Sequence, residues 1–286
     1  MYTYNFLNYF TKFIINNNPV RIFNNWKNRR EFMRKLPIES LIKEWNFDID
    51  IYILAFNKPD LIKAQIAFLK KHLLDKYRLI IVDNSNVKSD VVRQVCISND
   101  VSYVKLPNNK LEHSHSHWAA LNYIMKNFIL KQKTKYFWLL DHDCFLVKNL
   151  SVVDLLNKQS FWWLSIDNVV VNIFWKNLNF AGNRWFLWPW CSFFRKDVFD
   201  KGYNFSPIKK WFPISFLDTW WGNWKYVYKY YNRKDLSLLS RKNYQWPIIK
   251  YGENIGNLFY HIWWAGFGDE MEVKNIIDEL YKHVIF

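Results

Sequence analysis

Two aspartates separated by a single residue interrupt the apolar run YFWLLDHDCFLV, which covers residues 136–147. If the run is a strand, Asp141 and Asp143 point to the same side, while His142 and Cys144 face away from them, towards packing. Two carboxylates buried at a strand end need compensation, which a divalent cation such as Mg²⁺ or Mn²⁺ supplies while also bridging to a diphosphate. The spacing therefore predicts an oxygen-ligated metal site, with an acidic turn or helix cap as the alternative.

Three histidines alternate in the run HSHSH shortly upstream, at His113, His115 and His117. On a strand their rings would share one face as a zinc tripod. However, the sequence from Trp118 onward is typical of a helix, on which residues two apart do not share a face. No cysteine stands nearby to complete a zinc site. A solvated loop and a zinc tripod both stay open for this run.

Short apolar runs alternate with helical patterns from Asp48 onward. The runs IDIYILAF, YRLIIVD, VSYVKL and YFWLLD have the composition of strands, and helical patterns such as LIKAQIAFLKKHLL separate them. This β-α-β-α-β-α-β order predicts a mostly parallel sheet covered by helices. Ligands bind beyond the carboxyl ends of such strands, which is where AFN, VDNS and DHD fall.

The same order of motifs resembles the GT-A glycosyltransferases, and most closely the large family 2 of inverting enzymes. AFNKP, VDNSN, the helix in HSHSHWAALNYIM and the D-x-D of LLDHDCF match that family's motifs in order, over about residues 49–231. The resemblance implies an α/β fold with a Rossmann-like, mostly parallel central sheet flanked by helices. An N-terminal helical leader would precede it.

The resemblance also implies roles for single residues around a nucleotide-diphosphate sugar. Asp83 would hold the base or the ribose, and Asp141 would contact the donor ribose or sugar. The three alternating histidines would lie beside the donor diphosphate, where ring N–H groups and helix-terminal amides hold anionic oxygens. The loop residues expected to line the nucleotide pocket are Ala55, Phe56 and Asn57.

The metal ligands implied are Asp143, Asp141 and His261, with Mn²⁺ or Mg²⁺ as the cofactor. For His261, in LFYHIWWAG, a core histidine bonded to a backbone carbonyl is the alternative. Asp218, in FLDTWW, corresponds best to the family's general base, although Leu217 replaces the usual glutamate. A carboxylate near a helix start beside Trp220 and Trp221 could meet a sugar stacked on an aromatic face.

The chain of 286 residues is expected to form one GT-A domain over 48–286, preceded by a basic, aromatic leader over 1–47. Within the domain, 48–150 would bind the nucleotide sugar and 151–286 the acceptor. The leader combines an aromatic face with a dense basic cluster, which is typical of a helix lying on a membrane. A helix that merely caps the domain is the alternative.

Composition narrows the location and the partners. Three cysteines at distant positions form no disulfide framework, so a reducing compartment is expected. The sequence has no uninterrupted run of 18 apolar residues, so no membrane-spanning helix is predicted. The protein is expected in the cytoplasm, and peripheral contact with the membrane's cytoplasmic face follows only if the leader lies on a membrane rather than capping the domain. The net charge of +15 indicates an anionic partner, here donor phosphates and an acidic or lipid-linked acceptor rather than nucleic acid.

The function predicted is therefore transfer of a sugar from a UDP- or GDP-linked donor to a glycan or lipid-linked glycan. Two alternatives belong to other classes. A non-catalytic module could bind glycans or nucleic acid through the basic, aromatic surface. Nucleotidyl transfer also uses paired aspartates, but the first strand lacks a glycine-rich or basic triphosphate signature.

Overall fold

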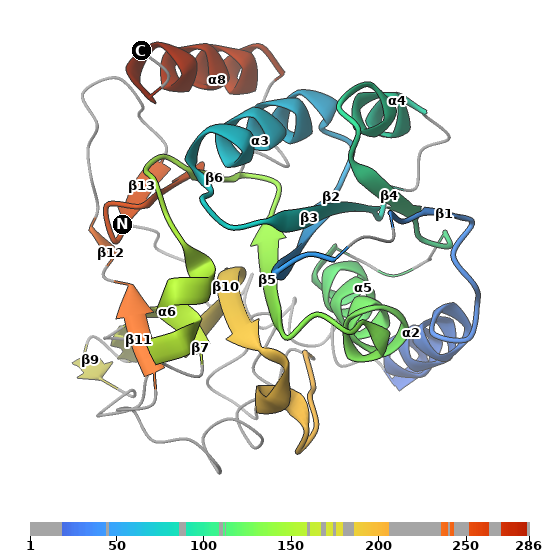
Figure 1. The fold of residues 1–286 in the computed structure, drawn as a ribbon. Helices are drawn as coiled ribbons and strands as arrows, with labels where there is room; N and C mark the ends of the chain where they lie inside the picture. Colours follow the sequence, from blue (N-terminus) through green and yellow to red (C-terminus); the bar gives the residue numbers. More distant parts are fainter. Residues whose placement is uncertain are drawn as a thin grey trace.

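An eight-stranded sheet runs through the computed structural model of the protein (Figure 1). Its strand order is β1-β4-β3-β2-β5-β10-β7-β11. The bounds are β1 Glu39–Leu41, β2 Ile49–Ala55, β3 Tyr77–Asp83, β4 Ser102–Lys105, β5 Tyr136–Asp141, β7 Phe161–Ile166, β10 Phe186–Arg195 and β11 Leu236–Leu239. The structure describes residues 19–43, 46–85, 90–108, 111, 113–158, 161–166, 170–173, 176–179, 186–205, 236–239, 241–242, 252–262 and 270–284.

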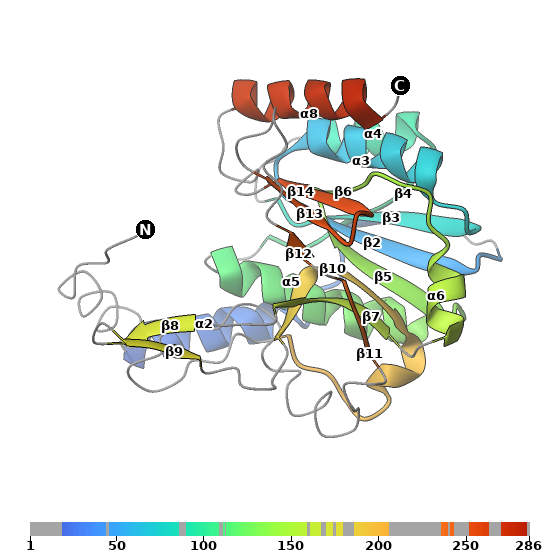
Figure 2. The same cartoon turned by 90° about the vertical axis from the view of Figure 1, so that its left-hand side faces the viewer.

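Helices cover both faces of this sheet (Figures 1 and 2). On one face lie α3 and α4, with α8 packed outside α3, and on the other face lie α2 and α5. Between β5 and β7 the chain forms α6. The bounds are α2 Pro19–Phe32, α3 Pro59–His72, α4 Val91–Ser98, α5 His113–Asn127, α6 Val152–Lys158 and α8 Glu270–Val284, with 3₁₀ turns η1 Ile129–Lys131 and η2 Lys196–Phe199. None of the helices in the described part is both long and apolar enough to cross a membrane.

The centre of the sheet is parallel, in the order β4-β3-β2-β5. The chain moves outward from β2 to β3 and β4, and then crosses back through α5 to place β5 on the other side of β2. The strand order therefore reverses between β2 and β5. Antiparallel pairs flank this centre, where β1 pairs with β4 and β10 pairs with both β5 and β7, and β11 then pairs with β7 in parallel at the far edge. The predicted mostly parallel sheet flanked by helices is confirmed.

Apolar side chains explain why these strands form the centre. Every residue of β2 is buried, as are most of β3 and β5, which is typical of strands covered on both faces. Trp138 lies on β5 edge-to-face with Phe193 of β10. The three cysteines are free thiols buried in this core.

Smaller sheets complete the fold. A four-stranded antiparallel sheet has the order β12-β13-β14-β6, and β8 pairs with β9 in a hairpin. The bounds are β6 Cys144–Leu146, β8 Val170–Ile173, β9 Lys176–Asn179, β12 Arg241–Lys242, β13 Gly252–Ile255 and β14 Phe259–Ile262. The prediction of one continuous strand over residues 136–147 was wrong. The strand breaks at residues 142–143, and the two parts, β5 and β6, belong to different sheets.

The described part of the N-terminal leader contacts the main domain. Phe32, at the end of α2, is buried against Tyr123 of α5, with ring centroids 5.3 Å apart. Residues 39–41 then add β1 to the edge of the main sheet. The domain boundary at residue 47 stays a prediction, and residues 1–18 lie outside the described part.

Candidate functional site

The carboxyl ends of the central parallel strands bring the predicted site residues into one row. In the register, Leu54 pairs with Asp141, Ala55 with Asp83, and Asp83 with Lys105. This row includes the point between β2 and β5 where the strand order reverses. Open α/β sheets bind ligands at such a point, because the connecting loops diverge there and leave a crevice.

A tight turn follows β5 and carries the two aspartates. Gln65 of α3 is fully buried, and its side-chain Nε2 donates to the carbonyl oxygens of Asp141 at 2.8 Å and Cys144 at 2.7 Å. The backbone amide of Ile262 in β14 donates to the carbonyl of Asp143 at 2.9 Å. Hydrogen bonds from two other elements therefore fix the turn from both sides.

Asp141 faces α5. Its Oδ1 lies 3.2 Å from Nε2 of His117, and both side chains are about one quarter exposed. Burial by itself raises the pKa of Asp141, but the charge and hydrogen bond of His117 act in the opposite direction. The rings of His142 and His261 add to the effect of His117, so the pKa lies below its ordinary value. Asp141 is therefore held as a carboxylate beside a histidine.

Asp143 faces β14. Because His261 pairs with Cys144 in the β14–β6 register, its ring is brought beside the turn. Nε2 of His261 lies 3.7 Å from Oδ1 of Asp143, which is an ion-pair distance but too long for a hydrogen bond. Oδ1 is buried and has no hydrogen-bond partner. A buried carboxylate oxygen without a donor is costly and suits a cation.

Unpartnered polar atoms gather around this turn. Among the described residues, seven buried side-chain polar atoms lack a hydrogen-bond partner, and three of them belong to Gln65, His142 and Asp143. Nδ1 of His142 lies 3.1 Å from the carbonyl oxygen of Leu54, so Nδ1 is the donor to that oxygen, and Nε2 has no hydrogen-bond partner. Native proteins rarely leave buried polar atoms without a hydrogen-bond partner, so three such atoms near one turn indicate a binding site for a polar or ionic ligand.

The described residues do not bring three metal-ligating side chains to metal-binding geometry. The structure instead shows two pairs, Asp141 with His117 and Asp143 with His261. Cys144 is buried beside Cys191, and burial together with a hydrogen bond to Cys191 raises the pKa of the Cys144 thiol. Because a protonated thiol is a poor metal ligand, a mixed histidine–cysteine site is disfavoured.

The histidine run forms the first turns of α5, which begins at His113. The sequence is typical of a helix from Trp118 onward. In the structure the helix begins five residues before that, at His113. Nε1 of Trp118 donates to Nδ1 of His115 at 3.0 Å, so the neutral ring of His115 carries its proton on Nε2. His117 reaches Asp141. The side chain of His113 is outside the described part.

Asp83 is fully buried beneath the row, at the end of β3. Its oxygens accept from the backbone amide of Ser85, the hydroxyl of Tyr103 and Nζ of Lys105, each at 2.9 Å. In this structure Asp83 braces the turn after β3. A role in holding the base or ribose stays a prediction.

The loop after β2 is joined to the loop after β3. The backbone amide of Asn57 donates to Oγ of Ser85 at 2.8 Å, and the amide of Asn84 donates to the carbonyl of Ala55 at 3.0 Å. Asn57 is exposed and has a φ of 53°, a left-handed conformation that asparagine tolerates better than most residues. Phe56 is half-buried between them. These loops therefore form one wall beside the aspartates.

Some predicted residues cannot be placed against this geometry. Asp218, Trp220 and Trp221 lie outside the described residues. Conversely, sequence reasoning did not single out Gln65 or Lys105. A glutamine inside the otherwise apolar face of LIKAQIAF was the one available signal for Gln65, since a buried amide needs partners.

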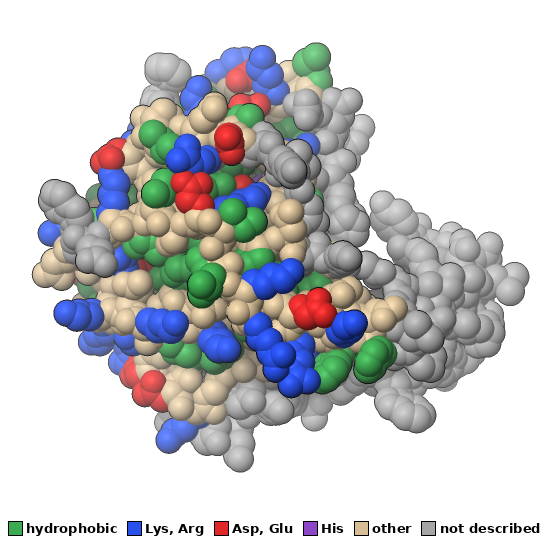
Figure 3. All heavy atoms as spheres, turned by 90° about the vertical axis from the view of Figure 1, so that its right-hand side faces the viewer, with side chains coloured by type: hydrophobic (Ala, Val, Ile, Leu, Met, Phe, Trp, Pro, Cys, Tyr) green, Lys and Arg blue, Asp and Glu red, His purple; other side chains and the backbone are tan. Residues whose placement is uncertain are grey.

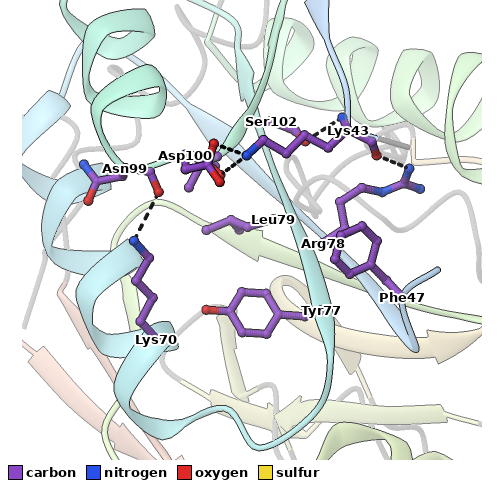
Figure 4. A pocket seen from close by; sticks show the side chains of 10 residues that line it. Lys43, Phe47, Lys70, Tyr77, Arg78, Leu79, Asn99, Asp100 and Ser102 are labelled. Carbon is purple, nitrogen blue, oxygen red and sulfur yellow. Dashed lines mark hydrogen bonds and ion pairs between the residues drawn. The ribbon is translucent and has the colours of Figure 1, made fainter. Parts of the chain in front are cut away.

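A separate cavity of about 640 Å³ opens at the opposite edge of the sheet, near the starts of β3 and β4 (Figure 4). Tyr77 and Leu79 line it beneath Lys43, Lys70 and Arg78. Each of these cations already has a protein partner. Lys43 pairs with Asp100, Lys70 donates to the carbonyl of Asn99, and Arg78 pairs with Asp50. The cavity walls therefore offer less to a charged ligand than the turn after β5.

Comparisons with known proteins give a limited likeness. No protein-family description matches the chain, and no curated protein sequence is significantly similar to it. Among solved structures, a mannosyltransferase from Pyrobaculum calidifontis in complex with GDP-Man and Mn²⁺ is 10% identical, over 62% of this chain and 52% of that one, with a TM-score of 0.37. The match thus spans about half of that protein's length.

Two further structures are similar at the same level. TarS from S. aureus is 13% identical over 55% of this chain and 30% of its own, with a TM-score of 0.36. The mannosyltransferase Ktr4p from S. cerevisiae is 15% identical over 63% of this chain and 67% of its own, also at 0.36. At these scores the function has to be argued from the residues of the site itself.

Replacing Gln65 with Met tests the role of the hydrogen bonds that hold the turn. Met has a similar volume but donates nothing, so two buried carbonyls lose their donor. We expect unfolding free energy to fall by about 1–3 kcal/mol. We also expect the Mn²⁺ concentration needed for half-maximal stabilisation in a thermal-shift titration to rise several-fold. Ile49→Val, a core change at the start of β2, at the far end of the strand from the turn, serves as the control that lowers stability without changing the metal titration.

Proposed function

We propose that this chain transfers a sugar from a nucleotide-diphosphate sugar to a hydroxyl group of a glycan or lipid-linked glycan, with inversion at the sugar carbon. The observation that carries the proposal is the placement of Asp141 and Asp143 at the strand-order reversal, with a buried Asp143 oxygen that has no hydrogen-bond partner. The order of the motifs, which resembles GT-A family 2, supports the reaction class.

The ligands proposed for Mn²⁺ or Mg²⁺ are Asp143, Asp141 and His261. Two carboxylates and an imidazole form a donor set that accepts either ion. A divalent cation bound there would neutralise the diphosphate that leaves with the nucleotide. The orphaned oxygen of Asp143 and the nearby ring of His261 fit such an ion.

Other residues around the two aspartates have proposed roles that need no metal. His117 beside Asp141 presents a ring that can donate to a phosphate or sugar oxygen when the carboxylate turns away. The buried cluster of Asp83, Tyr103 and Lys105 holds the loop that would face the nucleotide. His113 and His115 are proposed to complete the anion pocket at the start of α5.

Proton removal from the acceptor is proposed for Asp218, with Trp220 and Trp221 as the stacking surface for the sugar. This assignment rests on the resemblance alone. A carboxylate acting as general base would take the hydroxyl proton as the oxygen attacks the sugar carbon and the nucleoside diphosphate departs. One bond forms at the sugar carbon as another breaks, which inverts its configuration.

A panel of nucleotide sugars tests the proposal directly. The full-length protein is incubated with UDP-, GDP- and CMP-sugars in the presence of Mn²⁺, and release of the free nucleotide is measured. We expect slow hydrolysis of at least one UDP- or GDP-linked donor, abolished by EDTA and restored by Mn²⁺ or Mg²⁺. Thermal stabilisation by UDP or GDP should likewise require the metal. Metal-independent, salt-sensitive stabilisation by polyanions would favour the non-catalytic binding module instead.

A further inference from the structure

Large apolar side chains project into solvent from α2 and from the segment that connects it to β1. Phe23 is 59% exposed, Trp26 45%, Leu36 84% and Ile38 63%. Scattered single apolar residues on a surface are ordinary, but four large and exposed ones within sixteen residues of the chain are not. We call this the α2 surface, made of Phe23, Trp26, Lys27, Arg30, Leu36 and Ile38.

Basic side chains are interleaved with these apolar residues. Lys27 and Arg30 are exposed on α2 itself, and the guanidinium of Arg30 lies over the ring of Trp26, 5.4 Å from its centroid. Arg34 and Lys35 add two more exposed positive charges. Figure 3 shows basic and hydrophobic side chains side by side at the lower right of its view, with an acidic side chain among them. Glu31 is an exposed acidic residue of α2, so the basic residues outnumber it. Together they form an amphipathic, positively charged surface.

The opposite side of α2 is fixed to the domain, so the surface has a defined orientation. Phe32 is buried against Tyr123, whose hydroxyl donates to the carbonyl of Lys35 at 2.8 Å. The guanidinium of Arg29 lies over the ring of Trp118, 4.8 Å from its centroid. Because these contacts occupy the inner face, the exposed residues do not pack into the protein's own core.

We propose that the α2 surface docks onto an anionic lipid bilayer. Its positive charge complements acidic headgroups, and the exposed Phe, Trp, Leu and Ile side chains can enter the boundary between headgroups and acyl chains. A nucleic acid would stack on the aromatic rings and pair with the cations, but it would make no favourable contact with Leu36 and Ile38, the most exposed apolar residues of this surface. Leu36 and Ile38 neither stack on bases nor bond to phosphates. A lipid surface uses all six residues.

Docking at this surface would also fix the orientation of the candidate site relative to the membrane. Helix α2 packs on α5, and the first turns of α5 contribute His115 and His117. Trp118 joins the two regions, because it contacts Arg29 on one side and donates to His115 on the other. If the proposed sugar transfer holds, a lipid-linked acceptor fits this arrangement. The docking itself does not depend on that function.

Vesicle flotation with the full-length protein tests the docking without any nucleotide. The probes are phosphatidylcholine vesicles with and without about one third phosphatidylglycerol. We expect the wild type to bind the anionic vesicles and not the neutral ones. The variant Lys27→Gln/Arg30→Gln should lose about twenty- to thirtyfold in partitioning, since each basic residue near an anionic surface contributes about a fivefold factor. Trp26→Ser/Leu36→Ser/Ile38→Ser should lose at least about tenfold.

Matched controls use exposed residues elsewhere. Leu74→Ser/Ile97→Ser removes two exposed apolar side chains, and Lys63→Gln/Lys133→Gln removes two exposed charges, and both should bind like the wild type. Circular dichroism checks that every variant is folded. Equal binding by surface and control variants, or no binding by the wild type, overturns the proposal. So does a dimer in light scattering that only the surface variants lose, because the surface would then belong to a second copy.

Discussion

Asp143→Asn is expected to lower metal-dependent donor turnover by about a hundredfold to a thousandfold, the size of effect seen when one preorganised charge-stabilising group is removed from an active site. The change is nearly isosteric, so it removes a negative charge without leaving a cavity. The neutral amide oxygen is a weaker ligand of a hard cation than the charged carboxylate. The measurement is nucleotide release at saturating donor, with Mn²⁺ varied.

The same variant should be at least as stable as the wild type when no metal is present. Oδ1 of Asp143 is buried without a hydrogen-bond partner, so neutralising it removes a desolvation cost and breaks no hydrogen bond. Activity and stability are therefore expected to change in opposite directions, as at sites where a protein holds an unfavourable group for function. Mn²⁺ should raise the melting temperature of the wild type but not of the variant.

Asp154→Asn is the matched control, because Asp154 is an exposed aspartate on α6. It should leave both turnover and the response to Mn²⁺ unchanged. Undiminished turnover in Asp143→Asn would remove the metal site from the proposal. A variant that loses turnover together with stability would assign Asp143 a structural role instead.

The central sheet could be predicted because its signal is local. Each of the strands β2 to β5 lies in a short, mostly apolar run, and the intervening helices show their own period. Right-handed crossovers then leave few ways to arrange them. The aspartates at the end of β5 could likewise be assigned to the carboxyl edge, since Asp141 ends its strand whatever the rest of the chain does.

The contacts that complete the site could not be predicted, because they depend on segments far apart in sequence. Gln65 lies 76 residues before Asp141, and the side-chain amide reaches it only after α3 has packed on the sheet. Only the family resemblance grouped His261 with the two aspartates, and in the structure His261 reaches Asp143 through the pairing of β14 with β6. The apolar run LFYHIWW carries no local signal for the strand that it will join.

The leader shows the same limit in another form. Its basic and aromatic composition indicated a surface helix, and α2 has that character on its outer face. Nothing local indicated that Phe32 would fill a gap beside Tyr123, or that residues 39–41 would extend the sheet beyond β4. Edge strands this short carry little sequence signal, because half of their side chains face solvent.

Arg78→Met is expected to destabilise the fold by about 3–5 kcal/mol, the cost of leaving one member of a buried ion pair without its partner. Arg78 and Asp50 are paired in the β2–β3 register and are both almost fully buried. Nε and Nη2 of Arg78 donate to the two Asp50 oxygens at 2.8 and 2.7 Å. Nη2 also donates to Gln132 Oε1, and Nη1 donates to the carbonyl of Lys43.

Urea denaturation of a double-mutant cycle separates the pair from the packing. Asp50→Leu/Arg78→Met should recover most of the stability lost in Arg78→Met, since replacing both charges with apolar groups removes the uncompensated carboxylate. Arg93→Met breaks the more exposed pair with Glu39 and should have a much smaller effect. If Arg78→Met costs no more than Arg93→Met, then water reaches Asp50, and the start of the central sheet is more open than its burial indicates.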